Sequence, residues 1–318
     1  MPPAAGTDDI VMPFAIEGAG VRGRLARLGP VINEILARHA YPAPVAQLLG
    51  EALTLTAMLG TALKLEGRFT IQTSSDGPVD FLVADMTREG GLRGYAHFDS
   101  GRVERLDTTR QPALHEIAGA GHLALTVDQG PGRNSYQGVV PLEGANLAEC
   151  GEAYFARSEQ LPTLIRLVVA EARTRGALGQ WRAGGLMIQH MPADGGRVRD
   201  LDPGDAPQGA IVADDDDDED WSRARILMET LEDHELVDPS LAPERVLYRL
   251  YHEDGVRAFA PHALSFECRC SRDYIGGVLR SFGEAEMADM VTADGTIEVR
   301  CEFCNKTYSF SPEETGET

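Results

Sequence analysis

The residue types with the clearest chemistry in this sequence are four cysteines close to its C-terminus. Cys268 and Cys270 form a C-x-C motif, Cys301 and Cys304 form a C-x-x-C motif, and thirty residues separate the two pairs. Thiolates held in pairs on short turns supply the four soft ligands that a tetrahedral zinc ion prefers. The spacing therefore predicts a zinc site, and a metal-free redox dithiol is the main alternative.

These sulfurs could serve either a structural or a regulatory purpose. A closed all-thiolate zinc centre is usually structural. Zinc nevertheless holds its cysteine ligands as thiolates, which is the form that oxidants attack. Arg269, Arg272, Arg300 and Lys306 lie close in sequence and are expected to add positive charge around the thiols. From these residues alone, both roles stay open.

Other motif-like spacings do not assemble a catalytic site. Gly18, Gly20 and Gly23 fit G-x-G-x-x-G, but Pro30 interrupts any helix that would follow, so we expect a hairpin turn there. Cys150 stands alone and is expected to be a buried structural thiol. Because no set of acid, base and nucleophile is evident, we do not expect an enzyme.

The charge balance narrows the possible partners. The chain of 318 residues has 50 acidic and 29 basic side chains, a net charge of −21, which argues against a nucleic-acid partner. No uninterrupted apolar run approaches the length needed to span a bilayer, and residues 1–9 lack a signal-type pattern. We therefore expect a cytoplasmic protein without a membrane partner, whose thiols stay mostly reduced.

The pattern of apolar residues predicts an α+β fold in three parts. Residues 1–192 form an N-terminal α/β core domain with strands in meander order, and residues 193–262 form a partly helical linker. Residues 263–318 form a small C-terminal zinc-binding domain. Within the core we expect helices over 31–39, 44–64 and 147–158, and strands over 68–73, 79–85, 92–98, 122–128, 135–140, 163–172 and 185–190.

The linker combines structure-breaking residues with a strong local charge. Repeated Pro and Gly residues precede Asp214 to Asp220, seven consecutive acidic residues that we expect to form a solvated, disordered loop. Two amphipathic helices are expected after it, over 221–233 and 243–252. Such short helices have marginal stability by themselves, so the linker is expected to be metastable.

The last fifty or so residues are too few to bury a large core, so a metal staple is expected. Helices are predicted over 273–280 and 284–290. Strands are predicted over 296–300 and 307–310, on either side of the C-x-x-C turn. This arrangement is typical of a zinc knuckle.

The same residues resemble a known family. The C-terminal segments FECRCSRD (266–273), LRS (279–281) and VRCEFCNKTY (299–308) are similar to the zinc domain of the heat shock protein 33 family, whose members are redox-regulated holdase chaperones. The resemblance continues through the core, where the matching segments are VRGRLARLG (21–29), EGRFTIQ (66–72), LRGYA (92–96), LTVDQG (125–130), YQGVVPL (136–142) and SEQLPT (158–163).

The resemblance implies a specific mechanism. One zinc ion per chain would be held by Cys268, Cys270, Cys301 and Cys304 in the reduced, inactive protein. Oxidants would form the disulfides Cys268–Cys270 and Cys301–Cys304 and release the zinc. The linker would then unfold, the core would form a homodimer, and unfolding client proteins would be held without ATP. The acidic run at 214–220 departs from the usual pattern and looks like an insertion. A zinc-ribbon interaction module with a purely structural zinc is the alternative.

Overall fold

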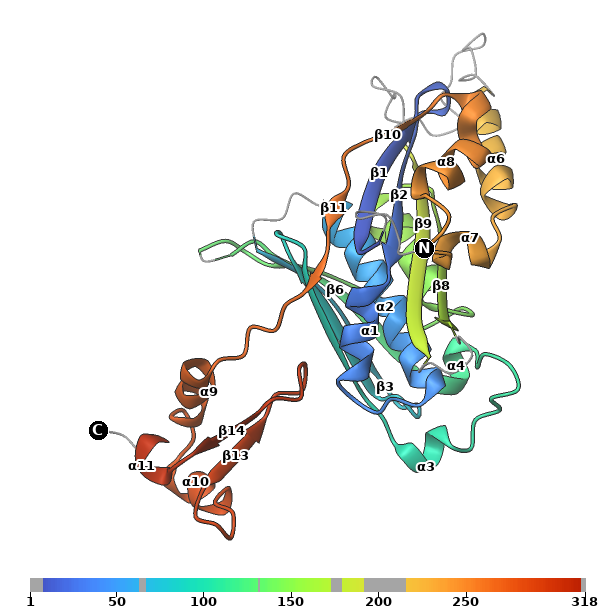
Figure 1. Ribbon diagram of the computed structural model, residues 1–318. Coiled ribbons are helices and arrows are strands. Elements are labelled where there is room, and N and C mark those ends of the chain that lie inside the picture. Colours follow the sequence, from blue (N-terminus) through green and yellow to red (C-terminus); the bar gives the residue numbers. More distant parts are fainter. Residues whose placement is uncertain (1–7, 63–66, 131, 173–178, 192–215, 316–318) are drawn as a thin grey trace, which may run out of the picture.

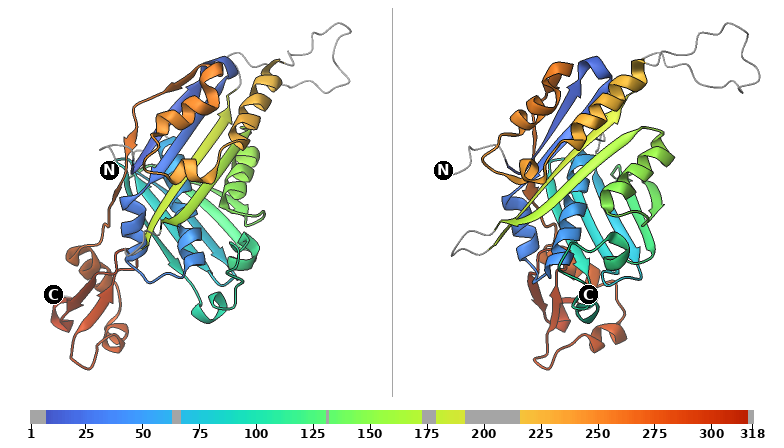
Figure 2. Two further views of the ribbon diagram at one scale, coloured as in Figure 1. Left: turned by 45° about the vertical axis from the view of Figure 1, so that its right-hand side comes forward. Right: turned by 90° about the vertical axis from the view of Figure 1, so that its right-hand side faces the viewer.

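The structure is a computed structural model that describes residues 8–62, 67–130, 132–172, 179–191 and 216–315. Two six-stranded sheets enclose one long helix (Figures 1 and 2). The first sheet has the strand order β10-β1-β2-β9-β8, with β11 also paired to β1, and the second has the order β12-β5-β4-β3-β6-β7. This mixed architecture confirms the predicted α+β class.

The enclosed helix, α2 (Ala43–Ala62), is buried on nearly all sides. It contacts strands of both sheets, and the shorter helix α1 (Pro30–Ala37) precedes it. Within the described ranges, α2 is the one helix long and apolar enough to cross a membrane. However, 83% of its apolar stretch is buried inside the protein. Its apolar composition is therefore explained by packing between two sheets rather than by a single stripe facing one of them.

The first sheet is built on a hairpin of β1 (Ile10–Ile16) and β2 (Val21–Leu28), completed by β8 (Thr163–Ala172) and β9 (Gln180–His190). The hairpin turns through a short 3-10 segment, and Gly20 adopts a left-handed backbone with φ of 56°. The glycine-rich motif is thus a hairpin turn, as predicted. The strand expected over 185–190 starts earlier, because β9 pairs with β2 and β8 along its whole length.

The second sheet is antiparallel except at one edge, where β12 runs parallel to β5. Its main strands lie within two or three residues of the predicted ranges: β3 (Arg68–Ser75), β4 (Phe81–Thr87), β5 (Gly91–His97), β6 (Gly121–Asp128) and β7 (Tyr136–Pro141). Three short helices follow or interrupt these strands: α3 (Ser100–Val103), α4 (Leu114–Ile117) and α5 (Leu147–Tyr154), the last continuing as a π-helical turn over Phe155–Glu159.

Three helices cover the outer face of the first sheet (Figure 2). They are α6 (Asp216–Glu229), α7 (Asp233–Val237) and α8 (Pro243–Tyr251). Apolar side chains from strands and helices meet there in what we call the outer-face cluster, which includes Met12, Phe14, Leu25, Leu186, Ile188, Met228, Leu231, Leu236, Leu250 and Tyr251. This cluster is separate from the core around α2.

The expectation of a loop throughout the acidic run is wrong for its last five residues. Residues 216–220 form the first turns of α6, whereas Asp214 and Asp215 lie outside the described residues.

After α8 the chain crosses from one sheet to the other (Figure 1). β10 (Val256–Ala258) and β11 (His262–Ala263) pair with β1 of the first sheet, and β12 (Ser265–Phe266) pairs with β5 of the second. None of these short strands was predicted.

The C-terminal unit follows directly and has a small apolar cluster of its own. Its elements are α9 (Arg272–Leu279), α10 (Glu284–Asp289), β13 (Ile297–Arg300), β14 (Thr307–Phe310) and α11 (Pro312–Thr315). All but α11 match the predicted elements.

Candidate metal centre

The C-x-x-C motif occupies the turn between β13 and β14. The turn is closed by backbone hydrogen bonds: the amide of Asn305 donates to the carbonyl of Cys301 (2.8 Å), and the amide of Cys301 donates to the carbonyl of Lys306 (2.9 Å). Asn305 adopts a left-handed backbone with φ of 60°, a conformation that asparagine tolerates better than most residues. This geometry fixes Cys301 and Cys304 on one side of a tight knuckle.

The C-x-C motif lies on the extended segment between β12 and α9. Ser271 ends this segment by capping α9, because its hydroxyl accepts a hydrogen bond from the amide of Tyr274 (3.1 Å). The hydroxyl of Tyr308 on β14 lies 3.2 Å from the sulfur of Cys270. The start of a helix and a neighbouring strand therefore hold this motif against the knuckle.

The structure brings all four sequence-predicted cysteines together. Their sulfur atoms lie within 4.8 Å of one another, with 3.3 Å between Cys268 and Cys270, 3.6 Å between Cys268 and Cys301, and 3.3 Å between Cys270 and Cys304. Four sulfurs around zinc at about 2.3 Å would be spaced by about 3.8 Å. The donor set and its spacing therefore fit a tetrahedral thiolate metal site.

The thiols of this cluster differ in acidity. Burial by itself would raise the pKa of Cys270, but hydrogen bonds from the Tyr308 hydroxyl and the neighbouring thiols outweigh it and lower the pKa to about 7. Burial raises the pKa of Cys268 and of Cys304. The fifth cysteine, Cys150, is fully buried on α5 as predicted, and burial raises the pKa of its thiol to about 11.

Two of the four basic residues expected around the thiols are neutralised by carboxylates. Arg269 forms an ion pair with Asp85 on β4 (2.7 Å), and Arg272 forms one with Glu314 (3.0 Å). Lys306 lies over the ring of Tyr308, with its Nζ atom 4.9 Å from the ring centroid. The predicted positive environment is therefore weaker than the sequence suggested.

Both cysteine motifs contact the core through one buried carboxylate. Asp85, whose side chain is 4% exposed, pairs with Arg269 from the C-x-C motif and with Arg93 on β5 (3.0 Å). The guanidinium of Arg93 in turn stacks on Phe303 from the C-x-x-C motif, 3.8 Å from the ring centroid. We call these four residues the Asp85 contact.

A second contact joins the knuckle to the end of α1. The ring of His39 donates a hydrogen bond to the carbonyl of Glu302 (2.7 Å), and the side chain of Asn305 donates to the carbonyl of Arg38 (2.8 Å). The guanidinium of Arg38 also lies 4.8 Å from the ring centroid of Phe266 on β12. The position of the knuckle relative to the core thus depends on the conformation of the cysteine turn.

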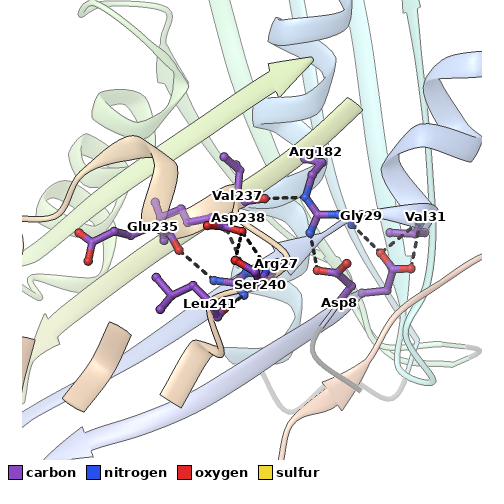
Figure 3. Close-up of polar contacts among 12 residues, drawn as sticks. Asp8, Arg27, Gly29, Val31, Arg182, Glu235, Val237, Asp238, Ser240 and Leu241 are labelled. Carbon is purple, nitrogen blue, oxygen red and sulfur yellow. Dashed lines mark hydrogen bonds and ion pairs between the residues drawn. The ribbon is translucent and has the colours of Figure 1, made fainter. Parts of the chain in front are cut away.

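Polar side chains of the core anchor the linker helices as well (Figure 3). Arg27 on β2 is fully buried and donates hydrogen bonds to the backbone carbonyls of Glu235 (2.9 Å), Leu236 (3.2 Å) and Leu241. Arg182 on β9 donates to the carbonyl of Val237 (2.5 Å) and pairs with Asp8 (2.5 Å). These two guanidiniums satisfy the carbonyls at the C-terminal end of α7.

Sequence reasoning missed Arg27, Asp85 and Arg93. For Asp85 and Arg93 a signal was present, because each is a charged residue inside a strand that is otherwise largely apolar. Arg27 shares β2 with Arg22 and Arg24, so the pattern does not single it out. Charged side chains in buried strands need a partner, so their presence indicates a specific contact. The sequence does not say that the partners lie in the linker and the cysteine unit.

Comparison with known proteins agrees with this architecture. The sequence model of the family described as "Hsp33 protein" matches residues 9–311. A "33 kDa chaperonin" from Caulobacter vibrioides is 44% identical over 306 residues, which cover 96% of this chain and 95% of the relative. One from Nitrosococcus oceani is 38% identical over 93% of this chain and 89% of its own length.

A solved structure has the same fold. The crystal structure of the 33 kDa chaperonin from Thermotoga maritima superposes with a TM-score of 0.73, covers 96% of both chains and is 24% identical in sequence. The family model, the two sequence relatives and this fold all lead to one assignment. The chain belongs to the Hsp33 family of chaperones.

Proposed function

We propose that this chaperone is a redox-regulated, ATP-independent holdase that is inactive when its cysteines are reduced. The observation that carries the proposal is the gathering of four free thiols within 4.8 Å of one another, in contact with the core through the Asp85 contact. A change at the sulfurs therefore has a direct physical route to the rest of the molecule.

In the reduced state, Cys268, Cys270, Cys301 and Cys304 would hold one zinc ion. Bound zinc would fix the four thiolates in one place, and such binding is worth about 10–16 kcal/mol in small domains. The unit over residues 263–318 buries only a small cluster, so its folding would depend on those four ligands. In this proposal the rest of the chain consists of the core, residues 1–192, and the metastable linker, residues 193–262.

Oxidation would join the sulfurs of Cys268 and Cys270, and those of Cys301 and Cys304. Each new S–S bond releases two electrons from a pair of thiolates. A peroxide accepts them as its O–O bond breaks and takes up two protons to give two waters. Sulfurs paired in this way no longer bind zinc. Because the disulfides close loops of only a few residues, they would restore little order to the unit.

Loss of order would then reach the linker. Arg269 and Phe303 lie within the two motifs, so pairing the cysteines changes the backbone that holds the Asp85 contact. The linker helices lie between this unit and the core in sequence, and their apolar sides are buried in the outer-face cluster. Their release would uncover apolar surface on the helices and on the first sheet, which unfolded client proteins could bind.

The activated state is proposed to be a homodimer that binds unfolded or partly unfolded proteins in the cytoplasm. The acidic balance of the chain makes nucleic acid an unsuitable partner, and no membrane partner or enzymatic activity is proposed. The second candidate, a zinc-ribbon interaction module with a structural zinc, uses the same closed thiolate site but needs no oxidant.

An oxidant titration separates the two candidates. Zinc release, sedimentation and suppression of client aggregation are measured together on the full chain while peroxide is added at mild heat. We expect zinc release, dimer formation and client protection to rise in parallel. If zinc is released but no client is held, or if the reduced protein holds clients equally well, the redox proposal fails and the structural zinc module is favoured.

A further inference from the structure

A cavity of about 230 Å³ lies between the two sheets, next to the C-terminal part of α2. Its walls are largely apolar and include Leu59 from the helix, Phe69 and Leu125 from the second sheet, and Phe155 from the π-helical turn. Arg22 and Arg24 of β2 line it from the first sheet. The C-terminal unit, which carries the four clustered cysteines, contributes no residue to the lining of this cavity. The proposed thiol chemistry therefore does not explain why the cavity exists.

The two arginines occupy the side of β2 that faces the main core. Side chains alternate along a strand, and Ala26 and Leu28 of the same set are buried in the core around α2. Val21 and Leu25, on the opposite side, belong to the outer-face cluster. Arg24 is half-buried and Arg22 is exposed, so this side of β2 carries guanidinium groups where it approaches solvent. A half-buried charge at Arg24, next to the apolar positions Ala26 and Leu28, is a departure from the apolar alternation that is typical of a functional position.

These guanidiniums have no carboxylate partner among the residues that the structure describes. The Nε atom of Arg24 is buried and makes no hydrogen bond. Burial, and secondarily the charge of Arg22, lower the pKa of Arg24 to about 10. Glu159 also lines the cavity, but its carboxylate accepts a hydrogen bond from the Tyr154 hydroxyl (3.2 Å) and forms no ion pair with either arginine.

The absence of a counter-ion is informative in this chain. Acidic residues outnumber basic ones by 50 to 29, so carboxylates are the commoner partner available in sequence. Leaving a buried guanidinium nitrogen unpaired costs free energy, which a bound anion would recover through charge-assisted hydrogen bonds. The apolar walls favour a ligand whose remaining part is hydrocarbon.

We propose that this cavity binds a small amphiphile, with a carboxylate at Arg24 and Arg22 and an apolar chain against Phe69, Leu125 and Phe155. The volume of about 230 Å³ is smaller than the roughly 300–1,000 Å³ of pockets for drug-sized ligands, which suits a medium-chain carboxylic acid. This binding activity goes beyond the proposed chaperone cycle and does not depend on it, because the cavity is built from the core alone.

The first test compares ligands on the reduced, full-length protein by isothermal titration calorimetry. Octanoate supplies both the charge and the chain, 1-octanol supplies the chain alone, and acetate supplies the charge alone. We expect octanoate to bind at least about 10-fold more tightly than either of the others, since a hydrogen bond to a charged group is worth about 1.5–3 kcal/mol. Equal affinities for octanoate and octanol, or no octanoate binding, would overturn the proposal.

The second test assigns the binding to this cavity. Arg24→Gln is expected to weaken octanoate binding by about 10-fold or more while leaving octanol binding unchanged, and Arg22→Gln is expected to weaken it less. Arg88→Gln, an exposed arginine on the β4–β5 turn, is the matched control and should bind as the parent does. Octanoate affinity that survives both Arg24→Gln and Arg22→Gln would place the ligand elsewhere, for example on the outer-face cluster, and reject this site.

Discussion

The residues between the cysteines are as informative as the cysteines themselves. Arg269 separates Cys268 from Cys270, and Phe303 lies between Cys301 and Cys304. Both contact the pair formed by Asp85 and Arg93, so each motif has one side chain in contact with the second sheet of the core. A thiol site on an isolated knuckle would need no such contacts.

The ligand assignment gives a prediction for single cysteines. Cys301→Ser should reduce zinc retention strongly, because a hydroxyl is a poorer zinc ligand than a thiolate and the remaining site has three sulfurs. Cys150→Ser is the matched control: this thiol is fully buried on α5 and donates to the carbonyl of Glu143 (3.3 Å), away from the cluster. Zinc content after chelator challenge is the measurement. A Cys301→Ser protein that keeps its zinc would refute the assignment.

Glu51 on α2 gives a pH prediction for the core. This residue is 6% exposed, and burial raises the pKa of its carboxyl group from the ordinary value of 4.5 to about 7, against hydrogen bonds from the Leu147 amide and from Gln111 (2.9 Å). The folded state therefore binds this proton more tightly than the unfolded chain does. This tighter proton binding by Glu51 adds to the free energy of unfolding. The contribution is complete below pH 4.5 and is lost as the pH rises to about 7.

Replacing Glu51 by Gln should remove the loss of stability that accompanies ionisation of the buried carboxyl group. Relative to the parent, Glu51→Gln should gain stability as the pH rises from 5.5 to 8, by about 2 kcal/mol. Urea unfolding of both proteins at the two pH values provides the measurement. A difference in unfolding free energy that does not change with pH would show that Glu51 titrates normally.

At the scale of elements, the docking of the linker depends on close approach to the first sheet. Gly184 on β9 lies directly beneath α7, and a Cβ atom there would lie 2.5 Å from the carbonyl oxygen of Leu236. Arg27 completes the same interface by binding three backbone carbonyls of the α7 region. Gly184 and Arg27 both contact backbone atoms of the α7 region. The side chains of the linker can therefore vary without loss of these two contacts.

This close approach predicts a variant that releases the linker without oxidant. Gly184→Ala should push α7 away from the sheet, since the neighbouring atom is backbone and cannot move aside, at a cost of about 1–3 kcal/mol. We expect faster amide hydrogen exchange over residues 233–251 and suppression of client aggregation by the reduced protein. Zinc content should stay unchanged.

Gly101→Ala is the matched control for this variant, because an added Cβ in α3 would meet only the Asp99 carboxylate, at an ordinary contact distance of 3.5 Å. If Gly184→Ala accelerates exchange in the linker but holds no client, release of the linker is insufficient for activity, and the outer-face cluster is not the client surface.

The sequence predicted the elements with strong periodicity and missed those that depend on distant partners. The apolar pattern of α2 and the alternation of β3 to β7 identified these elements to within a few residues, because burial of their own side chains determines them. The strands β10 to β12 are two or three residues long and exist through pairing with β1 and β5. Local sequence carries no signal for such pairing, and it also gave no sign that Arg27 binds the linker.

The gathering of the four cysteines was the most predictable feature of the molecule, since the paired spacing of cysteines along the chain is itself the signal. The contacts around it were not, because Asp85 and Arg93 lie about 180 and 210 residues from their partners Arg269 and Phe303. The structure of the acidic run was also mispredicted, because charge composition alone does not show that its last five residues begin a helix.

At the scale of the whole molecule, the Asp85 contact connects the thiol site to the second sheet and the linker helices cover the first. Asp85→Asn should leave Arg93 and Arg269 without a counter-charge, at a cost of about 1–3 kcal/mol after allowance for their partial exposure. We expect faster zinc release under peroxide and faster hydrogen exchange over residues 266–305.

Asp80→Asn is the control for this variant, because Asp80 lies just before β4 and pairs with His97 at the surface. Unchanged zinc release in Asp85→Asn would mean that the cysteine unit responds to oxidants independently of the core.

The short strands that follow α8 have one more consequence. β10 and β11 lie along β1, and β12 lies along β5, so a single stretch of about ten residues closes one margin of each sheet. If that stretch moves in the proposed unfolding of the linker, the peptide groups of β1 and β5 that face away from β2 and β4 lose their hydrogen-bond partners. An extended segment of another polypeptide could then add to either sheet as a new strand, whatever its side chains. A protein that must capture many different unfolded chains would gain from recognising the backbone they all share.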